Sequence, residues 1–449
     1  MGRMLILHTS DWHLGRSFHG TGMLEAQREV LAQLAETVRD RGVDLVLVAG
    51  DVYDRALPSA DAVELLDHTL AELSRAGARV VLTSGNHDSA IRLGFGGHLM
   101  DAAGVHLRTR LDGITEPVVL EDPDGGRVAV YGVPYLEPRQ AGQSWGVPAN
   151  HTAVTAEAVR RIREDAQARF GPRAEAAGTG DGGTALVVMA HLFAAGGAGS
   201  DSERDIGAGA PAVSGDGAAE TGADGDGAEA TAADGAGRAT GGDDGAGDGA
   251  DGVPAEGALV GTLGQVPVSV FEGVDYTALG HLHGRQAMTP TVRYSGSPLP
   301  YSFSEAGHVK GGLLVSTAGG AVTGVETVDW TAGRQLAVLR GRIDDLLQDP
   351  AHAWAEDRWC QVTVTDPVRP PQAYRRLKER FEGLLNFILE PEGGSTRAPS
   401  TYAARIAAAR SELEVCTGFV DHVRQRPASE SETGLLREAL AGTRTGGEA

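Results

Sequence analysis

Residues 45–54 read Leu-Val-Leu-Val-Ala-Gly-Asp-Val-Tyr-Asp, an apolar run that stops abruptly at Gly50 and Asp51. The run has the length of a buried β-strand. On either side, Met23–Arg41 and Ala60–Ala76 carry apolar residues at helical spacing. A strand flanked by two helices is typical of a sheet whose parallel strands are joined by crossover helices.

The same pattern continues outward from this strand. Met4–Thr9 is a short apolar run that leads into Asp11, and Ala78–Thr83 is another that leads into Gly85 and Asn86. The first 110 residues therefore predict an α/β layer fold. Open α/β sheets bind ligands beyond the carboxyl ends of their strands, which is where these polar residues fall.

The next part of the chain predicts a second sheet. Val128–Val133 and Leu186–Ala190 read as strands around a helix at 151–170. Further short strands, which we expect to form an antiparallel sheet, are Tyr276–Leu279, Val292–Ser295 and Gly312–Ser316. Two sheets packed face to face with helices outside give a four-layer α/β/β/α sandwich.

Composition sets limits on the class of protein. The chain has 449 residues, 41% of them hydrophobic and 22% charged, as in an ordinary globular protein. No apolar run is long enough to span a membrane, and the apolar start is too short for a signal peptide, so we expect a cytoplasmic protein without a membrane contact. Its two cysteines, Cys360 and Cys416, predict no disulfide framework.

The net charge of −22 is unevenly distributed. Residues 207–257 contain 11 Asp and Glu against the single Arg238, and 31 of these 51 residues are Gly or Ala. Such a stretch cannot bury enough apolar surface to offset its ordering entropy. We therefore predict a disordered acidic insertion within 199–257, inside a first domain that covers 1–330.

The remaining chain predicts a small α+β domain at 331–395 and a helical segment at 396–449. In the small domain, Gln335–Leu347 and Trp359–Val364 read as strands or a short helix, and Pro371–Leu389 reads as a helix. A linker then precedes a helix at Thr401–Val423. Ser429 and Glu432 have capping-box spacing at the start of a second helix. Two such helices are too small to form their own core, so we expect them to dock onto another surface.

Five polar motifs follow predicted strands and carry the chemistry. They supply two Asp, one Asn and four His as candidate metal ligands: Asp11, His13, Asp51, Asn86, His191, His281 and His283. A carboxylate at the end of a buried strand is costly unless cations neutralise it. Oxygen and imidazole ligands favour a pair of divalent ions, Mn²⁺ first and Fe²⁺ or Mg²⁺ as alternatives. This ligand set is typical of a two-metal phosphoesterase.

Several neighbouring residues have candidate supporting roles. His87 follows Asn86, so its side chain is expected to meet the phosphate or protonate the leaving oxygen. Asp88 is a candidate to orient His87, and Asp54 a candidate to support the ligands, although both also fit simple turn residues. Arg16 and His19 are candidates for phosphate contact.

The motifs resemble the SbcD family, the nuclease subunits of bacterial SbcCD complexes, which lie within the calcineurin-like metallophosphoesterases. The resemblance rests on Thr9–Gly15, Gly50–Asp54, Gly85–Ser89, Ala190–Leu192, Gly280–His283 and Tyr294–Pro298. Two further segments, Ser200–Arg204 and Tyr301–His308, separate this family from phosphatases. The resemblance implies one metal on Asp11, His13, Asp51 and His283, and another on Asp51, Asn86, His191 and His281. Asp51 then bridges the metals and His87 acts on the phosphodiester.

The resemblance also implies a function. It predicts a DNA nuclease of repair, recombination and replication, which degrades duplex ends in the 3′–5′ direction and cleaves single strands and hairpins. Its expected partner is an SbcC-like ATPase of the SMC family, with a nuclease homodimer inside a heterotetramer. The 331–395 domain would cap the DNA, Arg16 and His19 would contact it, and the terminal helices would dock on the ATPase. The alternatives are another metallophosphoesterase, such as a phosphatase or cyclic-nucleotide phosphodiesterase, and a non-catalytic scaffold.

Overall fold

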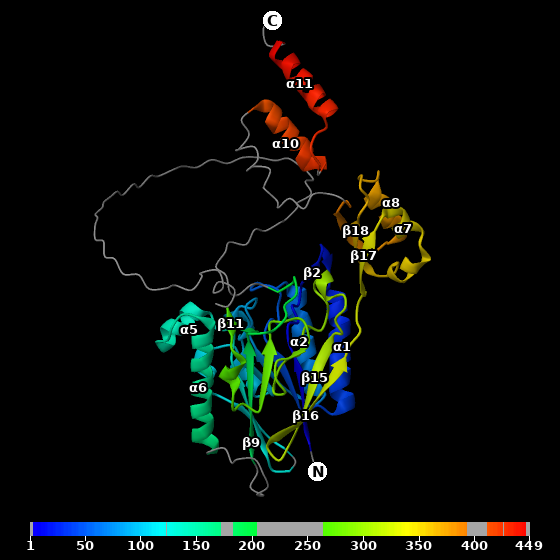
Figure 1. Cartoon of the computed structure of the whole chain (residues 1–449). Helices are drawn as coiled ribbons and strands as arrows, with labels where there is room; N and C mark the ends of the chain where they lie inside the picture. The colour runs from blue at the N-terminus through cyan, green and yellow to red at the C-terminus, as the bar shows by residue number, and fades with distance from the viewer. Residues whose placement is uncertain are drawn as a thin grey trace, which may run out of the picture.

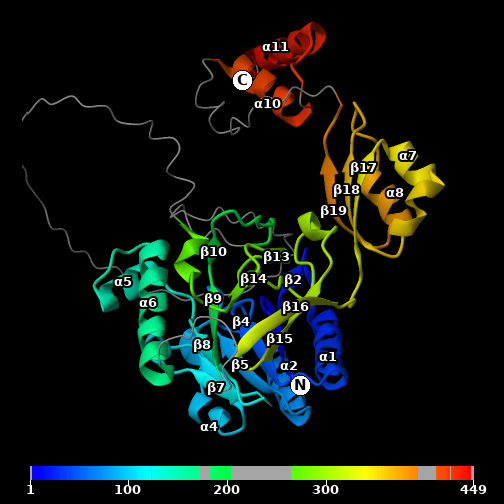
Figure 2. The ribbon, with the colours of Figure 1, turned by 60° about the horizontal axis from the view of Figure 1, so that its bottom comes forward.

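The computed structural model describes residues 3–122, 124–171, 183–203, 264–392, 411–424 and 426–445. Two six-stranded sheets form the part that holds the candidate site (Figures 1 and 2). The predicted acidic insertion lies outside the described residues from residue 204 onward. Residues 199–203, the first five of the predicted insertion, are described, and Ser202 and Glu203 contact His283.

The first sheet has the strand order β16-β15-β1-β4-β5-β6, and its last four strands are parallel. Its strands are β1 (Met4–Thr9), β4 (Leu45–Ala49), β5 (Arg79–Thr83), β6 (Val105–Arg108), β15 (Gly311–Ala318) and β16 (Ala321–Asp329). The crossover helices are α1 (Leu24–Arg41) and α2 (Ala60–Arg75). Ser59 caps α2 by accepting the Ala62 N–H, and Gly42 ends α1 with a left-handed φ of 63°. The predicted strand and helix order is confirmed here.

The second sheet has the order β13-β14-β12-β9-β8-β7. Its strands are β7 (Val118–Glu121), β8 (Arg127–Gly132), β9 (Thr184–His191), β12 (Tyr276–Gly280), β13 (Gln286–Ala287) and β14 (Val292–Tyr294). Helices α5 (Pro138–Trp145) and α6 (His151–Phe170) lie beside it (Figure 2). Shorter elements elsewhere are β2 (Ser17–Phe18), β3 (Thr21–Gly22), β10 (Phe193–Ala194), β11 (Gln265–Val266), α3 (Ala90–Leu93) and α4 (Gly97–Asp101).

The expected antiparallel pairing of this sheet is wrong. Strands β8, β9, β12 and β14 are parallel, and only the edge strands β7 and β13 pair antiparallel. The third strand of the predicted group, β15, pairs with β1 in the first sheet instead. Short strands with turns between them suggest hairpins, but the long connection between β9 and β12 permits a parallel crossover.

Three apolar cores separate four layers, as predicted. Alternate residues of the first sheet face α1 and α2, as Val46 and Val48 do, or face the second sheet, as Leu45 and Leu47 do. The second sheet packs in turn against α6. His8 lies fully buried between the sheets, where its ring bonds the Tyr276 hydroxyl at 2.9 Å. The fold is an α/β/β/α sandwich, with both faces of each sheet covered.

A small unit follows the sandwich. Its elements are β17 (Leu336–Gly341), α7 (Ile343–Gln348), β18 (Trp359–Val364), α8 (Ala373–Arg380) and β19 (Leu384–Leu389). The three strands form a parallel sheet with its own core. The prediction of a helix across Pro371–Leu389 is wrong at its end, because Gly383 allows β19 to approach Arg358. A Cβ on Gly383 would lie 1.9 Å from the Arg358 carbonyl oxygen. Phe18 stacks on Trp359 at 5.6 Å between ring centroids, which joins this unit to the sandwich near His13.

Two helices end the described chain, α10 (Glu412–Arg424) and α11 (Glu430–Thr445). The predicted capping box is present: Glu432 N–H donates to Ser429 Oγ at 3.3 Å, and Ser429 N–H donates to the Glu432 carboxylate at 2.8 Å. The predicted helical residues 401–410 lie outside the described part. No described helix is both long and apolar enough to cross a bilayer.

Candidate metal centre

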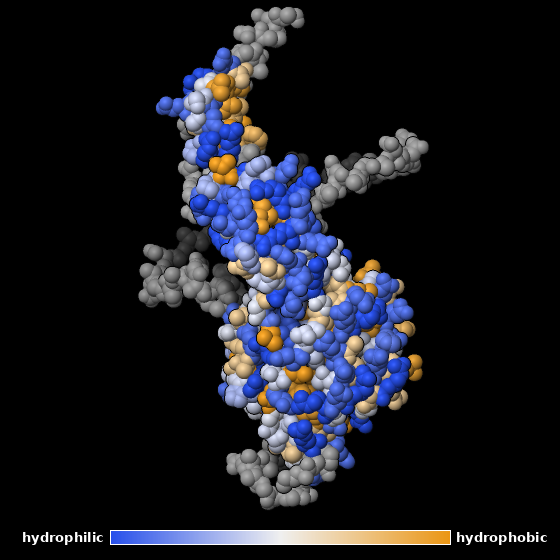
Figure 3. All heavy atoms as spheres, turned by 90° about the vertical axis from the view of Figure 1, so that its right-hand side faces the viewer, coloured by the Kyte–Doolittle hydropathy of each residue, from blue (hydrophilic) through white to orange (hydrophobic). Residues whose placement is uncertain are grey.

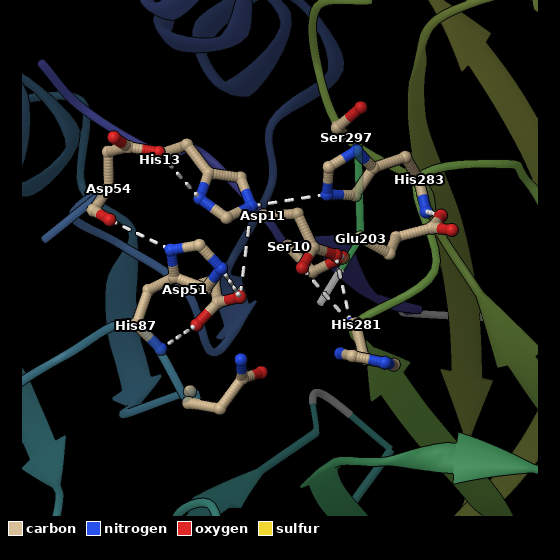
Figure 4. A network of polar contacts seen from close by, with 12 residues as sticks. Ser10, Asp11, His13, Asp51, Asp54, His87, Glu203, His281, His283 and Ser297 are labelled. Atoms are coloured by element: carbon tan, nitrogen blue, oxygen red, sulfur yellow. Dashed lines mark hydrogen bonds and ion pairs between the residues drawn. The ribbon is translucent and has the colours of Figure 1, made fainter. Parts of the chain in front are cut away.

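All seven predicted ligands lie together at the carboxyl ends of the parallel strands. Figure 4 shows five of them, Asp11, His13, Asp51, His281 and His283, around one space. Asp11 and His13 follow β1, Asp51 follows β4, and Asn86 follows β5. The second sheet contributes the residues at and after the ends of β9 and β12, namely His191, His281 and His283. Asn86 is half-buried, and the other six are at most 3% exposed. The strand ends of two different sheets therefore converge on one buried polar cluster.

The backbone at this cluster is strained. Asp11, His13, Asp51 and His281 have φ values of 55°, 44°, 48° and 106°, in a region that non-glycine residues rarely occupy. Strained positions of this kind collect at functional sites, where the surroundings hold them in place. The turns thus aim the side chains of these residues into the space between the sheets.

Two glycines allow the ligands to approach each other. A Cβ on Gly85 would lie 2.1 Å from Asp51 Oδ1, and one on Gly50 would lie 2.3 Å from His191 Nδ1. Both distances are shorter than any real side-chain contact, so the motifs Gly50-Asp51 and Gly85-Asn86 need glycine at their first position.

The donor atoms form overlapping groups. Ligand atoms of Asp11, His13 and His283 lie within 4.8 Å of one another, and so do those of Asp11, Asp51 and His191. Asp51 Oδ2 lies 3.3 Å from His191 Nε2 and 3.7 Å from His13 Nε2. Asp51 therefore reaches both halves of the cluster, which is the position predicted for a bridging carboxylate.

Hydrogen bonds at Nδ1 orient the rings of His191 and His283 so that Nε2 of each faces the cluster. His191 Nδ1 lies 3.0 Å from the Ala49 carbonyl oxygen, to which it donates. His283 Nδ1 lies 2.7 Å from Ser202 Oγ and 3.3 Å from the Glu305 carboxylate. A hydrogen bond at one ring nitrogen fixes the tautomer and frees the other nitrogen for a metal. Nε2 of His191 and Nε2 of His283 therefore point into the cluster, where each can serve as a ligand once it carries no proton.

Asn86 and His281 complete the second half of the cluster. Asn86 Oδ1 lies 3.0 Å from His191 Nε2. The His281 ring lies 5.4 Å from that of His191, and its backbone N–H donates to both carboxylate oxygens of Asp11. These contacts put an amide oxygen and a second imidazole beside His191 in this half of the cluster.

Burial and the charges of neighbouring groups shift the pKa values of the residues in the cluster. Burial raises the pKa of Asp11 to about 7. Burial alone would also raise the pKa of Asp51, but His191 and the nearby imidazoles hold it well below its usual range. Burial opposes the charged form of His191, yet Asp51 and Asp11 raise its pKa to about 9. Burial lowers the pKa of His281 to about 3. At neutral pH a protonated His191 thus neutralises Asp51 in the place where a cation would do so.

The residues present fit a pair of divalent ions. His13 Nε2 and His283 Nε2 face each other at 3.1 Å, and His13 Nδ1 has no hydrogen-bond partner among the described residues. A cation placed here would be coordinated by the imidazole nitrogens and would neutralise the two buried carboxylates. The ions, when bound, would supply Lewis acidity toward a phosphate and a nucleophile at neutral pH. The protein's own part is to hold these ligands and exclude competing solvent.

Metal binding should release protons, because His191 must lose its proton to become a ligand. The pKa of His191 near 9 and that of Asp11 near 7 mean that both groups carry protons at pH 7, wholly or in part. We expect Mn²⁺ affinity to rise between pH 6 and 9, with about one to two protons released at pH 7. Calorimetry in buffers of different ionisation enthalpy measures this number. An affinity that stays constant from pH 7 to 9 would contradict the assignment of His191.

His87 lies at the rim of the cluster. Its Nδ1 is 2.8 Å from the Asp54 carbonyl oxygen, and its Nε2 is 4.0 Å from Asp51 Oδ2. Its backbone N–H donates to Asp51 Oδ1 at 2.8 Å. His87 therefore helps to hold Asp51, while its ring presents a second nitrogen to the same space.

The supporting acids differ from the prediction in one respect. Asp54 approaches His13 Nδ1 at 3.6 Å as well as binding His87 through its carbonyl oxygen. Asp88, expected to orient His87, instead accepts the backbone N–H groups of Val52, Tyr53 and Gly85 at 2.9–3.0 Å. Its carboxylate thus links the loop that carries Asp51 with the loop that carries Asn86.

The two predicted phosphate contacts lie near the site but differ in their surroundings. Arg16 donates to Asp54 Oδ1 at 3.3 Å and to the Ser202 carbonyl oxygen at 3.1 Å, so its guanidinium is committed to protein acceptors. His19 is exposed, and its ring packs 5.1 Å from that of Phe303. His19 therefore has more freedom than Arg16 to meet a ligand.

The sequence analysis missed four residues that hold His283. Ser202 and Glu305 contact its ring, Glu203 accepts its backbone N–H, and Lys310 donates to its carbonyl oxygen. Glu305 and Lys310 are buried, which is rare for charged residues unless they are paired. The four residues lie in, or just after, the segments Ser200–Arg204 and Tyr301–His308, which the sequence alone does not connect with the metal motifs.

An α/β/β/α sandwich with carboxylates, an amide and imidazoles at its strand ends is consistent with the fold of a metallophosphoesterase. Residues 4–154 match the model of the calcineurin-like phosphoesterase family. The matched segment carries Asp11, His13, Asp51, Asn86 and His87. This part of the chain is thus similar to a hydrolytic, metal-dependent family, and its strand ends carry a candidate metal site.

Proposed function

We propose that this chain is a metal-dependent DNA nuclease of the SbcD type, using two divalent ions, Mn²⁺ in the first place. It would hydrolyse phosphodiesters at duplex ends in the 3′–5′ direction and within single strands or hairpins. The observation that carries the hydrolytic part is the convergence of six further metal-type side chains on Asp51, with His191 and His283 held so that Nε2 points into the cluster.

The choice of DNA is supported by the segments that distinguish the SbcD family from phosphatases. Ser202 and Glu203 come from one of these segments and Glu305 from the other. Both segments contact His283, as Ser202 and Glu305 do at 2.7 and 3.3 Å from its Nδ1. The small 331–395 unit, which we propose caps the DNA, joins the sandwich near His13 through the Phe18–Trp359 stack.

A phosphatase and a cyclic-nucleotide phosphodiesterase would share the metal chemistry, so substrate comparison is the test. We expect the purified chain with Mn²⁺ to degrade a labelled DNA hairpin and to act weakly on p-nitrophenyl phosphate and cyclic AMP. Rapid hydrolysis of either small substrate with intact DNA would contradict the nuclease proposal. Failure to bind Mn²⁺ would favour the scaffold alternative.

A homodimer is part of the proposal, and an exposed apolar stripe supports it. Ile91 on α3, Phe95 between the two helices and Leu99 on α4 are 88%, 86% and 83% exposed. Exposed apolar side chains within one short segment mark a candidate interaction surface. We expect Phe95→Glu to shift the chain from dimer to monomer in light scattering. Val368→Glu, at an apolar residue 80% exposed on the small unit, is the matched control. A wild-type chain that is monomeric at micromolar concentration would contradict this stripe as an interface.

The C-terminal helices are proposed to dock onto an SbcC-like SMC-family ATPase in a heterotetramer. Figure 3 shows apolar side chains on the surface of α10 and α11, where Phe419 and Leu435 are 51% and 67% exposed. Leu435→Glu should abolish co-elution with the ATPase and leave Mn²⁺ binding unchanged. Unchanged co-elution would place the partner surface elsewhere. A cytoplasmic location belongs to the same proposal, since such a complex acts on the chromosome.

A further inference from the structure

We propose that Glu305, clamped by Lys310, is a positioning residue that fixes His283 and couples the metal centre to residues 199–203. The inference rests on the proposed role of His283 as a metal ligand. It concerns contacts made by this chain's own residues, all of which are described.

His283 is held at three points. Its backbone N–H donates to Glu203 Oε1 at 2.5 Å, and its carbonyl oxygen accepts from Lys310 Nζ at 2.9 Å. Its Nδ1 meets Ser202 Oγ at 2.7 Å and Glu305 Oε1 at 3.3 Å. The remaining polar atom, Nε2, faces His13 Nε2 at 3.1 Å. These contacts hold the ring in one orientation and keep its proton on Nδ1, so that Nε2 points at the metal site.

Glu305 is the centre of this network. It is fully buried, and its Oε1 accepts from Ser200 Oγ at 3.1 Å as well as from Ser202 and His283. Its Oε2 is bound by the ammonium of Lys310, which also donates to Ser297 Oγ at 2.9 Å. Burying an ion pair rarely adds net stability, so a role in fixing geometry explains its place better than a role in folding.

Residues 199–203 are tied to the same atoms. Ser200 N–H donates to Glu203, and Asp201 N–H donates to Ser304 Oγ at 3.1 Å. The Ser202 carbonyl oxygen accepts from Arg16. The segment therefore touches His283 on one side and Arg16, three residues after His13, on the other. Because His283 serves both the metal site and this segment, binding at one should order the other, and the coupling is reciprocal.

The test combines Mn²⁺ calorimetry with hydrogen exchange on the full chain. Glu305→Ala should weaken one of the two Mn²⁺ sites by about 10–100-fold, as expected when the outer partner of a metal-bound histidine is lost. Glu305→Gln should weaken it less, because the amide oxygen still accepts from Nδ1. In the wild type, Mn²⁺ should slow exchange of the amides at 199–203, and Glu305→Ala should abolish that slowing.

Two further variants keep the test decisive. Ser202→Ala removes one hydroxyl and should weaken the same site by about 10-fold even if Glu305→Ala does not fold. Glu157→Gln is the control, since this glutamate is held by Arg160 and Arg161 on α6 and makes no contact with the site. Wild-type binding of two ions together with unchanged affinity and exchange in Glu305→Ala and Ser202→Ala would overturn the inference alone. Absence of Mn²⁺ binding by the wild type would overturn both the inference and the proposed function.

Discussion

Asp51→Asn should abolish hydrolysis and lower Mn²⁺ binding from two ions to one or none. Asp51 reaches His191 at 3.3 Å and His13 at 3.7 Å, so its carboxylate serves both halves of the cluster. The amide keeps the shape but loses the charge that two cations share. We expect the rate to fall by more than the roughly 10²–10³-fold that follows loss of one electrostatic donor. Calorimetry and a labelled DNA hairpin measure the two effects.

The control for this substitution lies at the opposite end of strand β4. Asp44 precedes β4 and accepts the Leu5 N–H at 2.7 Å, far from the cluster. Asp44→Asn should therefore keep both ions and full activity. Two bound ions in Asp51→Asn would show that Asp51 does not bridge. Loss of hydrolysis in both variants would point to misfolding instead of a specific role.

His87→Gln should lose activity while it keeps both metal ions. The ring is positioned by the Asp54 carbonyl oxygen and presents Nε2 toward the space beside Asp51. A proton donor or acceptor at this position contributes about 10²–10⁴-fold to a phosphodiester cleavage. We expect kcat to fall by that factor, with unchanged Mn²⁺ stoichiometry in calorimetry. The separation of the two readouts distinguishes His87 from a ligand.

His68→Gln provides the comparison. His68 is 59% exposed on α2, and its ion pair among the described residues is with Glu72, one turn further along the same helix. Wild-type kcat is expected for it. Loss of a metal ion in His87→Gln would show that His87 is itself a metal ligand. If His87→Gln kept full kcat, proton transfer by this ring would be excluded.

The sequence indicated which candidate ligands would lie together, because each lies at, or a few residues after, the end of an apolar strand. The run at Leu45–Ala49 marks its strand and the position of Asp51 at the same time. Parallel strands then bring their carboxyl ends together without any need to know the side-chain contacts. Local signals were equally reliable at the start of α11, where the Ser429 and Glu432 pair forms as expected.

Prediction failed where pairing depends on distant residues. The strand character of Tyr276–Gly280 is local, but its parallel partners β9 and β14 are chosen by the packing of the whole sheet. Glu305 and Ser202 are 103 residues apart, and only the fold shows that they share His283. Asp88 reads as a partner for the adjacent His87, yet it accepts the backbone N–H groups of Val52 and Tyr53 from another loop and that of Gly85 from its own turn.

The most direct test of the metal centre is anomalous diffraction from crystals soaked in Mn²⁺. The account predicts two peaks about 3.5–4 Å apart, the separation of a two-metal phosphoesterase site, one on each side of the Asp51 carboxylate. His13 and His283 should flank one peak, and Asn86 and His191 the other. A single peak remote from Asp51, or no peak among these residues in wild-type crystals, would contradict the account.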